Sequence, residues 1–141
     1  MNDPHAQLRR RHLSFGWYAL LGFASVGALL EALHAFKAGF YLDVGSETRR
    51  LMWRLGHAHG VLLGLIHVGF AATLPYTKEG ARRRLAWASA CLIAAGVLLP
   101  CGFLLGGVFA AGGDPGLPVL LVPLGIPMLL AALWCTARSL R

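Results

Sequence analysis

Four apolar stretches, each long enough to cross a lipid bilayer, constrain this chain more than any other feature of its sequence. They cover about residues 13–36, 51–74, 85–111 and 117–137, and about 20 apolar residues in a helix span the hydrocarbon core. Only 13% of the 141 residues are charged, whereas a soluble domain carries roughly 25%. The sequence therefore predicts a single all-α membrane domain over residues 1–141 and excludes an ordinary water-soluble enzyme.

Short connections join the predicted spans, so neighbours in sequence are expected to be antiparallel neighbours in a four-helix bundle. The basic residues are divided unevenly between the two ends of this bundle. The end with both termini holds Arg9, Arg10, Arg11, Lys78, Arg82, Arg83, Arg84, Arg138 and Arg141. The other end holds Lys37, Arg49, Arg50 and Arg54. The positive-inside rule then places both termini in the cytoplasm. We attribute the net charge of +7 to this topology and not to nucleic-acid binding.

Ionisable side chains within a membrane cost several kcal/mol, so each one indicates a candidate functional site. Glu31 is the only acidic residue in a predicted span, and the spans also hold His34, His57, His59 and His67. The first span ends and the second begins at the same end of the bundle, so the first four of these residues lie at one depth. His67 lies roughly 12–15 Å deeper, at about 1.5 Å of rise per residue.

Helical periodicity predicts where these side chains point. Glu31 and His34 share a stripe of the first span with small residues such as Gly27, which allow a partner helix to approach closely. His57 and His59 diverge by about 200° on a regular helix, so they are not expected to bind one ion there. We expect His57 to be the one that faces inward.

A second small-residue stripe runs along the second span. Gly56, Gly60 and Gly64 recur at every fourth position, and His67 lies on the same stripe. Ser89 of the third span is expected near the depth of His67. His5 and His12 precede the first apolar stretch and give no signal of a site.

The predicted site is a metal site formed by Glu31, His34 and His57, joined by His59 if the helix starts irregularly there, with His67 and Arg54 as further polar residues in the membrane. Imidazole and carboxylate ligands suit iron, copper or zinc, and histidines on facing helices suit a haem. Two alternatives stay open. Glu31 pairs with a histidine or with Arg54 and locks two helices together, or the cluster is part of a proton or substrate path, as in small four-helix exporters with one membrane glutamate.

A segment at the start of the second span carries a resemblance to known proteins. The run Leu55-Gly56-His57-Ala58-His59-Gly60-Val61-Leu62-Leu63-Gly64 resembles a segment of small four-helix bacterial membrane proteins. It is also similar to haem-bearing helices of the respiratory oxidase superfamily. The resemblance covers one span of four and implies a multi-pass protein of the bacterial inner (plasma) membrane whose histidines face a haem or a metal.

The function that these features favour is binding of a metal ion or haem through Glu and His near the periplasmic face, as a small redox or accessory subunit. A structural or assembly subunit without a cofactor is the first alternative, and a small proton-coupled transporter protomer is the second. The sequence favours a protein that is no enzyme by itself. The expected partners are the lipid bilayer and either further copies of the chain or a larger membrane complex, with no nucleic acid.

Overall fold

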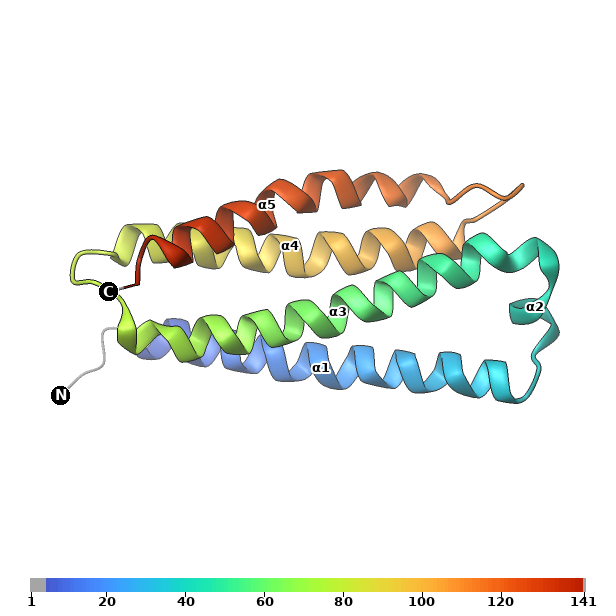
Figure 1. The fold of residues 1–141 in the computed structure, drawn as a ribbon, viewed down its shortest axis with the longest axis horizontal. Coiled ribbons are helices and arrows are strands. Elements are labelled where there is room, and N and C mark those ends of the chain that lie inside the picture. Colours follow the sequence, from blue (N-terminus) through green and yellow to red (C-terminus); the bar gives the residue numbers. More distant parts are fainter. Residues whose placement is uncertain (1–4, 141) are drawn as a thin grey trace.

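The computed structural model describes residues 5–140, and these residues form four long helices with short connections (Figure 1). The helices are α1 (Ala6–Ala35), α2 (Gly39–Leu42), α3 (Glu47–Thr73), α4 (Arg82–Val108) and α5 (Leu121–Ala137). Single 3-10 turns cover Val44–Ser46, Leu74–Tyr76 and Leu117–Leu120. All helices except the short α2 belong to segments long and apolar enough to cross a membrane. The predicted all-α architecture with four spans is confirmed.

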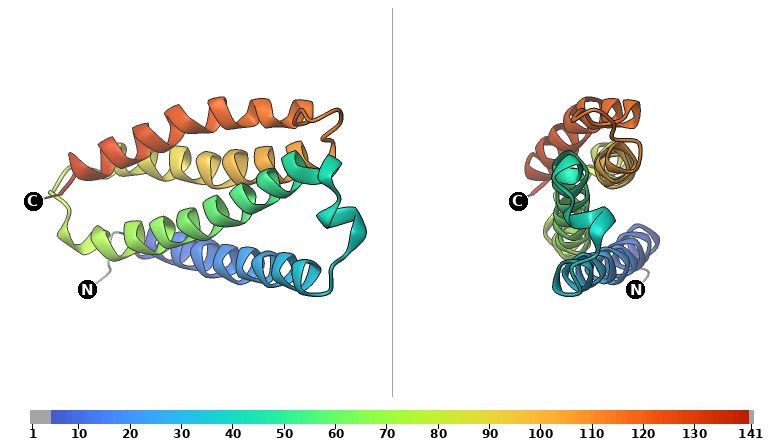
Figure 2. Two further views of the ribbon diagram at one scale, coloured as in Figure 1. Left: turned by 45° about the vertical axis from the view of Figure 1, so that its right-hand side comes forward. Right: turned by 90° about the vertical axis from the view of Figure 1, so that its right-hand side faces the viewer.

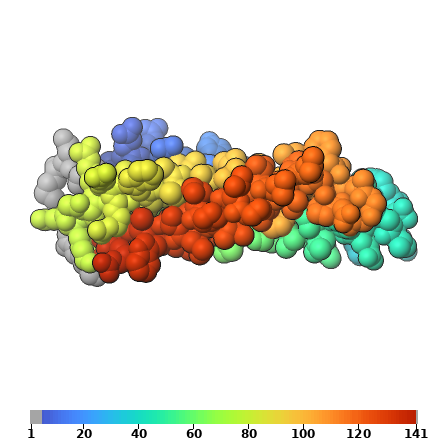
Figure 3. All heavy atoms as spheres, turned by 90° about the horizontal axis from the view of Figure 1, so that it is seen from above, coloured from blue at the N-terminus to red at the C-terminus, as the bar shows by residue number. Residues whose placement is uncertain are grey.

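The long helices pack in series, so that α1 contacts α3, α3 contacts α4 and α4 contacts α5. Each of these neighbours is antiparallel to the next, as predicted (Figure 1). The end-on view in Figure 2 shows α1 and α5 on opposite sides of the central α3–α4 pair. The space-filling view shows α5 running along α4 (Figure 3). Because α1 has extensive contact with α3 alone, the α1–α3 boundary is where a cleft can open.

The start of α1 and the end of α5 lie at the same end of the molecule, which we call the terminal end (Figure 1). Two hydrogen bonds hold the C-terminal segment against the α3–α4 connection and the start of α4. The Lys78 amide donates to the Ser139 carbonyl at 2.8 Å, and the Arg84 side chain donates to the Arg138 carbonyl at 2.9 Å. The shared end agrees with the predicted topology, while its cytoplasmic location stays a prediction.

The helix boundaries differ from the predicted spans at the start of the first span and at the start of the fourth. The first helix begins at Ala6, about two turns before the predicted apolar start at residue 13. The intervening charged residues are good helix formers with no proline or glycine among them, so the helix continues past the apolar stretch. The fourth span opens with a 3-10 turn at Leu117–Leu120, and α5 follows it.

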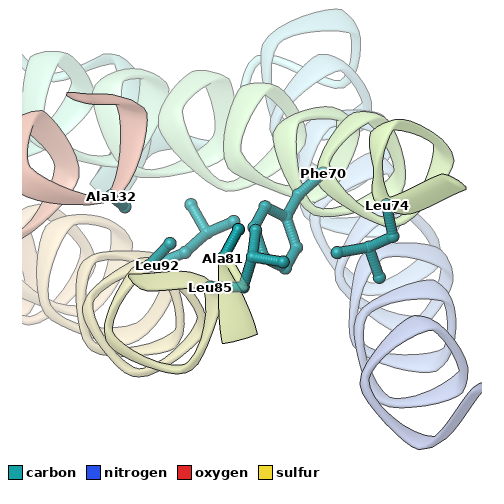
Figure 4. Packing of buried hydrophobic residues seen from close by; sticks show 7 residues of the cluster. Phe70, Leu74, Ala81, Leu85, Leu92 and Ala132 are labelled. Carbon is teal, nitrogen blue, oxygen red and sulfur yellow. The ribbon is translucent and has the colours of Figure 1, made fainter. Parts of the chain in front are cut away.

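The apolar core lies mainly between the two central helices. Its larger cluster sits near the terminal end and consists of Phe70, Leu74, Ala81, Leu85, Ala88, Leu92 and Ala132 (Figure 4). A second cluster, further along the same helices, holds Leu63, Ala95 and Leu99. The outer helices bury far fewer residues and expose large apolar side chains such as Leu21 on α1 and Leu130 on α5. This distribution fits a protein whose outer helices face lipid.

The glycines of α3 bring neighbouring helices close, as the small-residue stripe predicts. A Cβ atom on Gly16 of α1 would lie 2.8 Å from the Gly64 carbonyl oxygen, and Gly60 packs against the Phe23 ring. Gly56 instead packs against Leu104 of α4. The stripe therefore serves both neighbours of α3, and α1 approaches α3 at backbone contact near the terminal end.

Candidate functional site

The predicted polar residues line a cleft between α1 and α3 at the end opposite the termini. The cleft has a volume of about 470 Å³, and Glu31, His34, Arg54 and His57 all line it. The remaining lining side chains are small or apolar, apart from Tyr41 of α2. We call this the α1–α3 cleft. The structure thus brings together the two polar residues of α1 and two of those predicted on α3.

The short helix α2 contributes one residue to the lining of this cleft. Its residue Tyr41 is buried and lies parallel to the Trp53 ring, with centroids 6.2 Å apart. Arg50 donates to the backbone carbonyls of Tyr41 and Asp43, each at 2.8 Å. These contacts fix the α1–α3 connection against α3, so one wall of the cleft is held in place by the chain itself.

His57 faces inward, as predicted, and its orientation is fixed by the backbone of α1. Its Nδ1 lies 2.6 Å from the Phe23 carbonyl oxygen, and its ring packs against Gly27. A carbonyl oxygen only accepts hydrogen bonds, so Nδ1 carries the proton and Nε2 keeps its lone pair in the neutral ring. Within residues 5–140, Nε2 has no hydrogen-bond partner. The cleft therefore contains one oriented imidazole whose Nε2 keeps a lone pair and lies beside Gly27 of α1, where an added Cβ atom would be 2.8 Å away.

His59 does not line the cleft. Its Nδ1 bonds the Leu55 carbonyl of its own helix at 2.8 Å, and its ring contacts Phe103 of α4 with centroids 4.7 Å apart. The divergence of His57 and His59 follows the helical periodicity. Among the described residues, no group of three His, Cys, Asp or Glu side chains is close enough to hold a metal ion.

The other polar residues of the cleft have no partners. Glu31, His34 and Arg54 are exposed, and none of them forms a hydrogen bond or salt bridge in the part of the chain that the structure describes. The predicted pairing of Glu31 with Arg54 or a histidine is therefore not found there. Glu47 and Arg50, whose charged atoms lie 3.9 Å apart, form a pair on α3 away from these groups.

A second polar cluster, which we call the His12 cluster, lies in the core near the terminal end. It consists of His12 on α1, His67 on α3 and Ser89 on α4. The Nδ1 atoms of the two histidines are 2.8 Å apart, and His12 Nε2 is 2.7 Å from the Ser89 hydroxyl. Both histidines are completely buried, and Ser89 is nearly so. The cluster links three helices, including α1 and α4, which otherwise have little contact.

Aromatic rings enclose the His12 cluster. Phe15 stacks on His67 with centroids 4.2 Å apart, and Phe70 lies against His12 at 4.5 Å. His67 Nε2 is buried and has no hydrogen-bond partner within residues 5–140. A Cβ atom on Gly96 would lie only 2.9 Å from this nitrogen. The cluster is closed to solvent and tightly packed.

The prediction that His12 precedes the first span is wrong. It rested on the apolar stretch beginning near residue 13, whereas α1 begins at Ala6 and buries His12 among the helices. A signal was present: continuing the helical period back from Gly27 through Phe23 and Gly16 places His12 on the same face. The expectation that Ser89 lies near the depth of His67 agrees with the structure, where His12 bridges the two side chains.

No family model, curated protein or solved structure matches this chain. The resemblance in the second span therefore stays an expectation. The described residues support a multi-pass membrane protein with one open polar cleft and one closed polar cluster.

Proposed function

We propose that this membrane protein binds a haem in the α1–α3 cleft, with His57 Nε2 as the axial ligand, and serves as a small redox or accessory subunit. The observation that carries the proposal is the hydrogen bond from His57 to the Phe23 carbonyl. Histidines that bind metals almost always donate their second ring N–H to a carbonyl or carboxylate, which fixes the tautomer and raises the basicity of the ligand. His57 has this arrangement.

The number of ligands favours a haem over a bare metal ion. Iron, copper and zinc all accept imidazole, but a protein site for a bare ion ordinarily supplies three or more ligands. No such group of side chains exists among residues 5–140. A haem brings four nitrogen ligands of its own and needs only one or two from the protein. One oriented histidine is therefore sufficient.

The charges in the cleft agree with a ligand that has an acidic edge. Arg54 precedes His57 by three residues, a rise of roughly 4.5 Å toward the start of α3. Its guanidinium has no partner among the described residues and is suited to pair with a carboxylate such as a haem propionate. A haem held there would have Arg54 as the partner of its acidic edge, and the small and apolar lining, which includes Ala24 and Val61, would contact its rings.

Absorption spectroscopy tests the proposal, and α3 provides a matched control. The purified protein, as isolated or after reconstitution with haem, is expected to show a Soret band with one iron per chain. His57→Ala should lose this band, whereas His59→Ala should keep it because His59 faces α4. Elemental analysis of the same samples reports other metals. A protein that stays colourless after reconstitution would contradict the proposal, and so would equal loss of the Soret band in His57→Ala and His59→Ala.

A structural or assembly subunit without a cofactor is the second candidate. The largely uncovered outer helices α1 and α5 favour it, since both carry large exposed apolar residues that fit lipid or a partner helix. It predicts co-purifying membrane proteins and no change in their recovery with His57→Ala. A proton-coupled transporter has less support, because the cleft lies at one end of the helices and the His12 cluster at the other is closed.

A further inference from the structure

We infer that the terminal end contains a binding site for the phosphate headgroup of an anionic phospholipid, between the start of α1 and the start of α4. A pocket of about 340 Å³ lies there, lined by His5, Gln7, Leu8, Arg11, Arg82 and Ala86. The first four residues belong to α1 and the segment before it, and the last two to α4. The space-filling view shows the starts of the two helices beside each other at this end (Figure 3).

The two arginines give the pocket its specificity for an anion. Arg11 and Arg82 come from different helices and line the same pocket, and neither forms a hydrogen bond or salt bridge within residues 5–140. Glu79, in the α3–α4 connection, is exposed and likewise unpaired in the described part of the chain. Two unpaired guanidinium groups facing one space repel each other, and a phosphate between them removes this repulsion and accepts hydrogen bonds from both.

The depth of the pocket indicates a lipid as the source of the phosphate. Arg11 and Arg82 lie two or three residues outside the apolar stretches that begin near residues 13 and 85, which places them at the level of lipid headgroups. Basic pockets between membrane helices bind anionic headgroups in this region. Trp87, which is exposed one turn further along α4, is typical of a residue at the membrane interface. Acyl chains extend from this level beside the exposed helix surface.

The start of α4 adds a second attraction for an anion. Its N-cap residue, Ala81, provides no side-chain hydrogen bond to the first turn, and there is no acidic residue in that turn. The amide groups at a helix start carry a partial positive charge that favours a phosphate. A bound lipid would join α1 to α4 directly above the bond between His12 and Ser89, where these helices have little other contact.

Lipid binding by native mass spectrometry tests the inference. The probes are phosphatidylglycerol, phosphatidylcholine and inorganic phosphate, each titrated separately into the detergent-solubilised full chain. We expect phosphatidylglycerol to bind roughly tenfold or more tightly than phosphatidylcholine, since each basic residue near a membrane surface contributes about a factor of five. The double variant Arg11→Gln/Arg82→Gln should bind the two lipids with nearly equal affinity.

The control removes the same charge from the same end. Arg10 and Arg83 are exposed neighbours that do not line the pocket, so Arg10→Gln/Arg83→Gln should keep most of the preference for phosphatidylglycerol. If both double variants lose the preference for phosphatidylglycerol equally, the inference is overturned, because the attraction then comes from the general positive charge of this end and not from the pocket. A wild-type protein without preference would also overturn it, as would binding of inorganic phosphate as tight as that of the lipid. Neither double variant changes a residue of the α1–α3 cleft, so the outcome is independent of the proposed haem.

Discussion

The two polar clusters of this protein lie at opposite ends of the same two helices and differ in almost every physical respect. In the His12 cluster, His12, His67 and Ser89 are buried, bonded to one another and enclosed by phenylalanine rings. In the α1–α3 cleft, Glu31, His34 and Arg54 are exposed and have no partners in the described residues. Only His57 is fixed there, and its bond goes to the backbone.

The difference separates a structural role from a binding role. A buried polar group that finds its partners within the protein stabilises one arrangement of helices, and its removal leaves the partner unsatisfied. Polar groups left open in a cleft add nothing to packing and need a ligand or water for their hydrogen bonds. A histidine in a membrane helix is therefore not diagnostic by itself: His67 holds helices together, whereas His57 is oriented to bind.

Removal of a histidine from the His12 cluster should have the largest effect on stability. His67→Ala leaves His12 Nδ1 without its partner and opens space beneath Phe15. We expect a loss of about 2–3 kcal/mol in the free energy of unfolding, measured by reversible denaturation in mixed micelles. His34→Ala, in the cleft, should change it by less than about 0.5 kcal/mol. Similar losses in both variants would remove the distinction between the clusters.

Overpacking of the closed cluster should have the next largest effect. In Gly96→Ala the new methyl group lies 2.9 Å from His67 Nε2 and 3.1 Å from the Phe15 ring, so both rings must move. The expected loss is about 1–2 kcal/mol. Gly22→Ala is the matched control, because no atom lies within 4 Å of its added methyl group. If Gly96→Ala and Gly22→Ala change the free energy of unfolding equally, the His12 cluster is loosely packed.

The hydroxyl of Ser89 should contribute less than either histidine. Ser89→Ala removes the bond to His12 Nε2 but keeps the bond between the two rings. Side-chain hydrogen bonds between membrane helices contribute about 0.6 kcal/mol on average, and a loss of that size is expected in the same denaturation assay. A loss as large as that of His67→Ala would mean that the link from α1 to α4 dominates the cluster.

Changes in the cleft should leave stability almost unaltered. Arg54→Gln removes an exposed side chain without a partner among residues 5–140, so the free energy of unfolding should change by less than about 0.5 kcal/mol. The same variant should weaken haem binding by roughly tenfold, because one charge-assisted hydrogen bond is lost. Absorption titration measures the affinity. If Arg54→Gln lowers the free energy of unfolding and leaves the haem affinity unchanged, Arg54 has a structural role and no role in binding, contrary to both expectations.

Much of the fold could be predicted from the sequence, because length and hydropathy determine which segments span a membrane. The four spans, their antiparallel order and the inward direction of His57 follow from hydropathy, short connections and helical period. The packing of the helices in series could not be predicted from the sequence. Short connections make sequence neighbours adjacent, but they do not decide whether α1 also packs on α4. The short helix α2, which contributes Tyr41 to the cleft, left no periodic pattern in its four residues.

The candidate site was only partly predictable, for two physical reasons. Hydropathy locates the membrane core and not the ends of helices, so His12 was placed outside the first helix, although α1 continues two turns further. The direction of a side chain also depends on its local partner. Helical periodicity predicts that His59 points away from His57, but its bond to the Leu55 carbonyl and its contact with Phe103 depend on the packing of α3 against α4.

Chemical modification of the histidines, followed by mass spectrometry, tests the contrast between the two clusters most directly. Diethyl pyrocarbonate reacts with an accessible imidazole nitrogen lone pair, and the full-length protein can be treated with and without haem. The account predicts fast modification of His34 and His57 in the protein without haem, protection of His57 when haem is bound, and no modification of His12 or His67 in either state. Modification of His12 or His67 as fast as that of His34, or reactivity of His57 unaffected by haem, would contradict it.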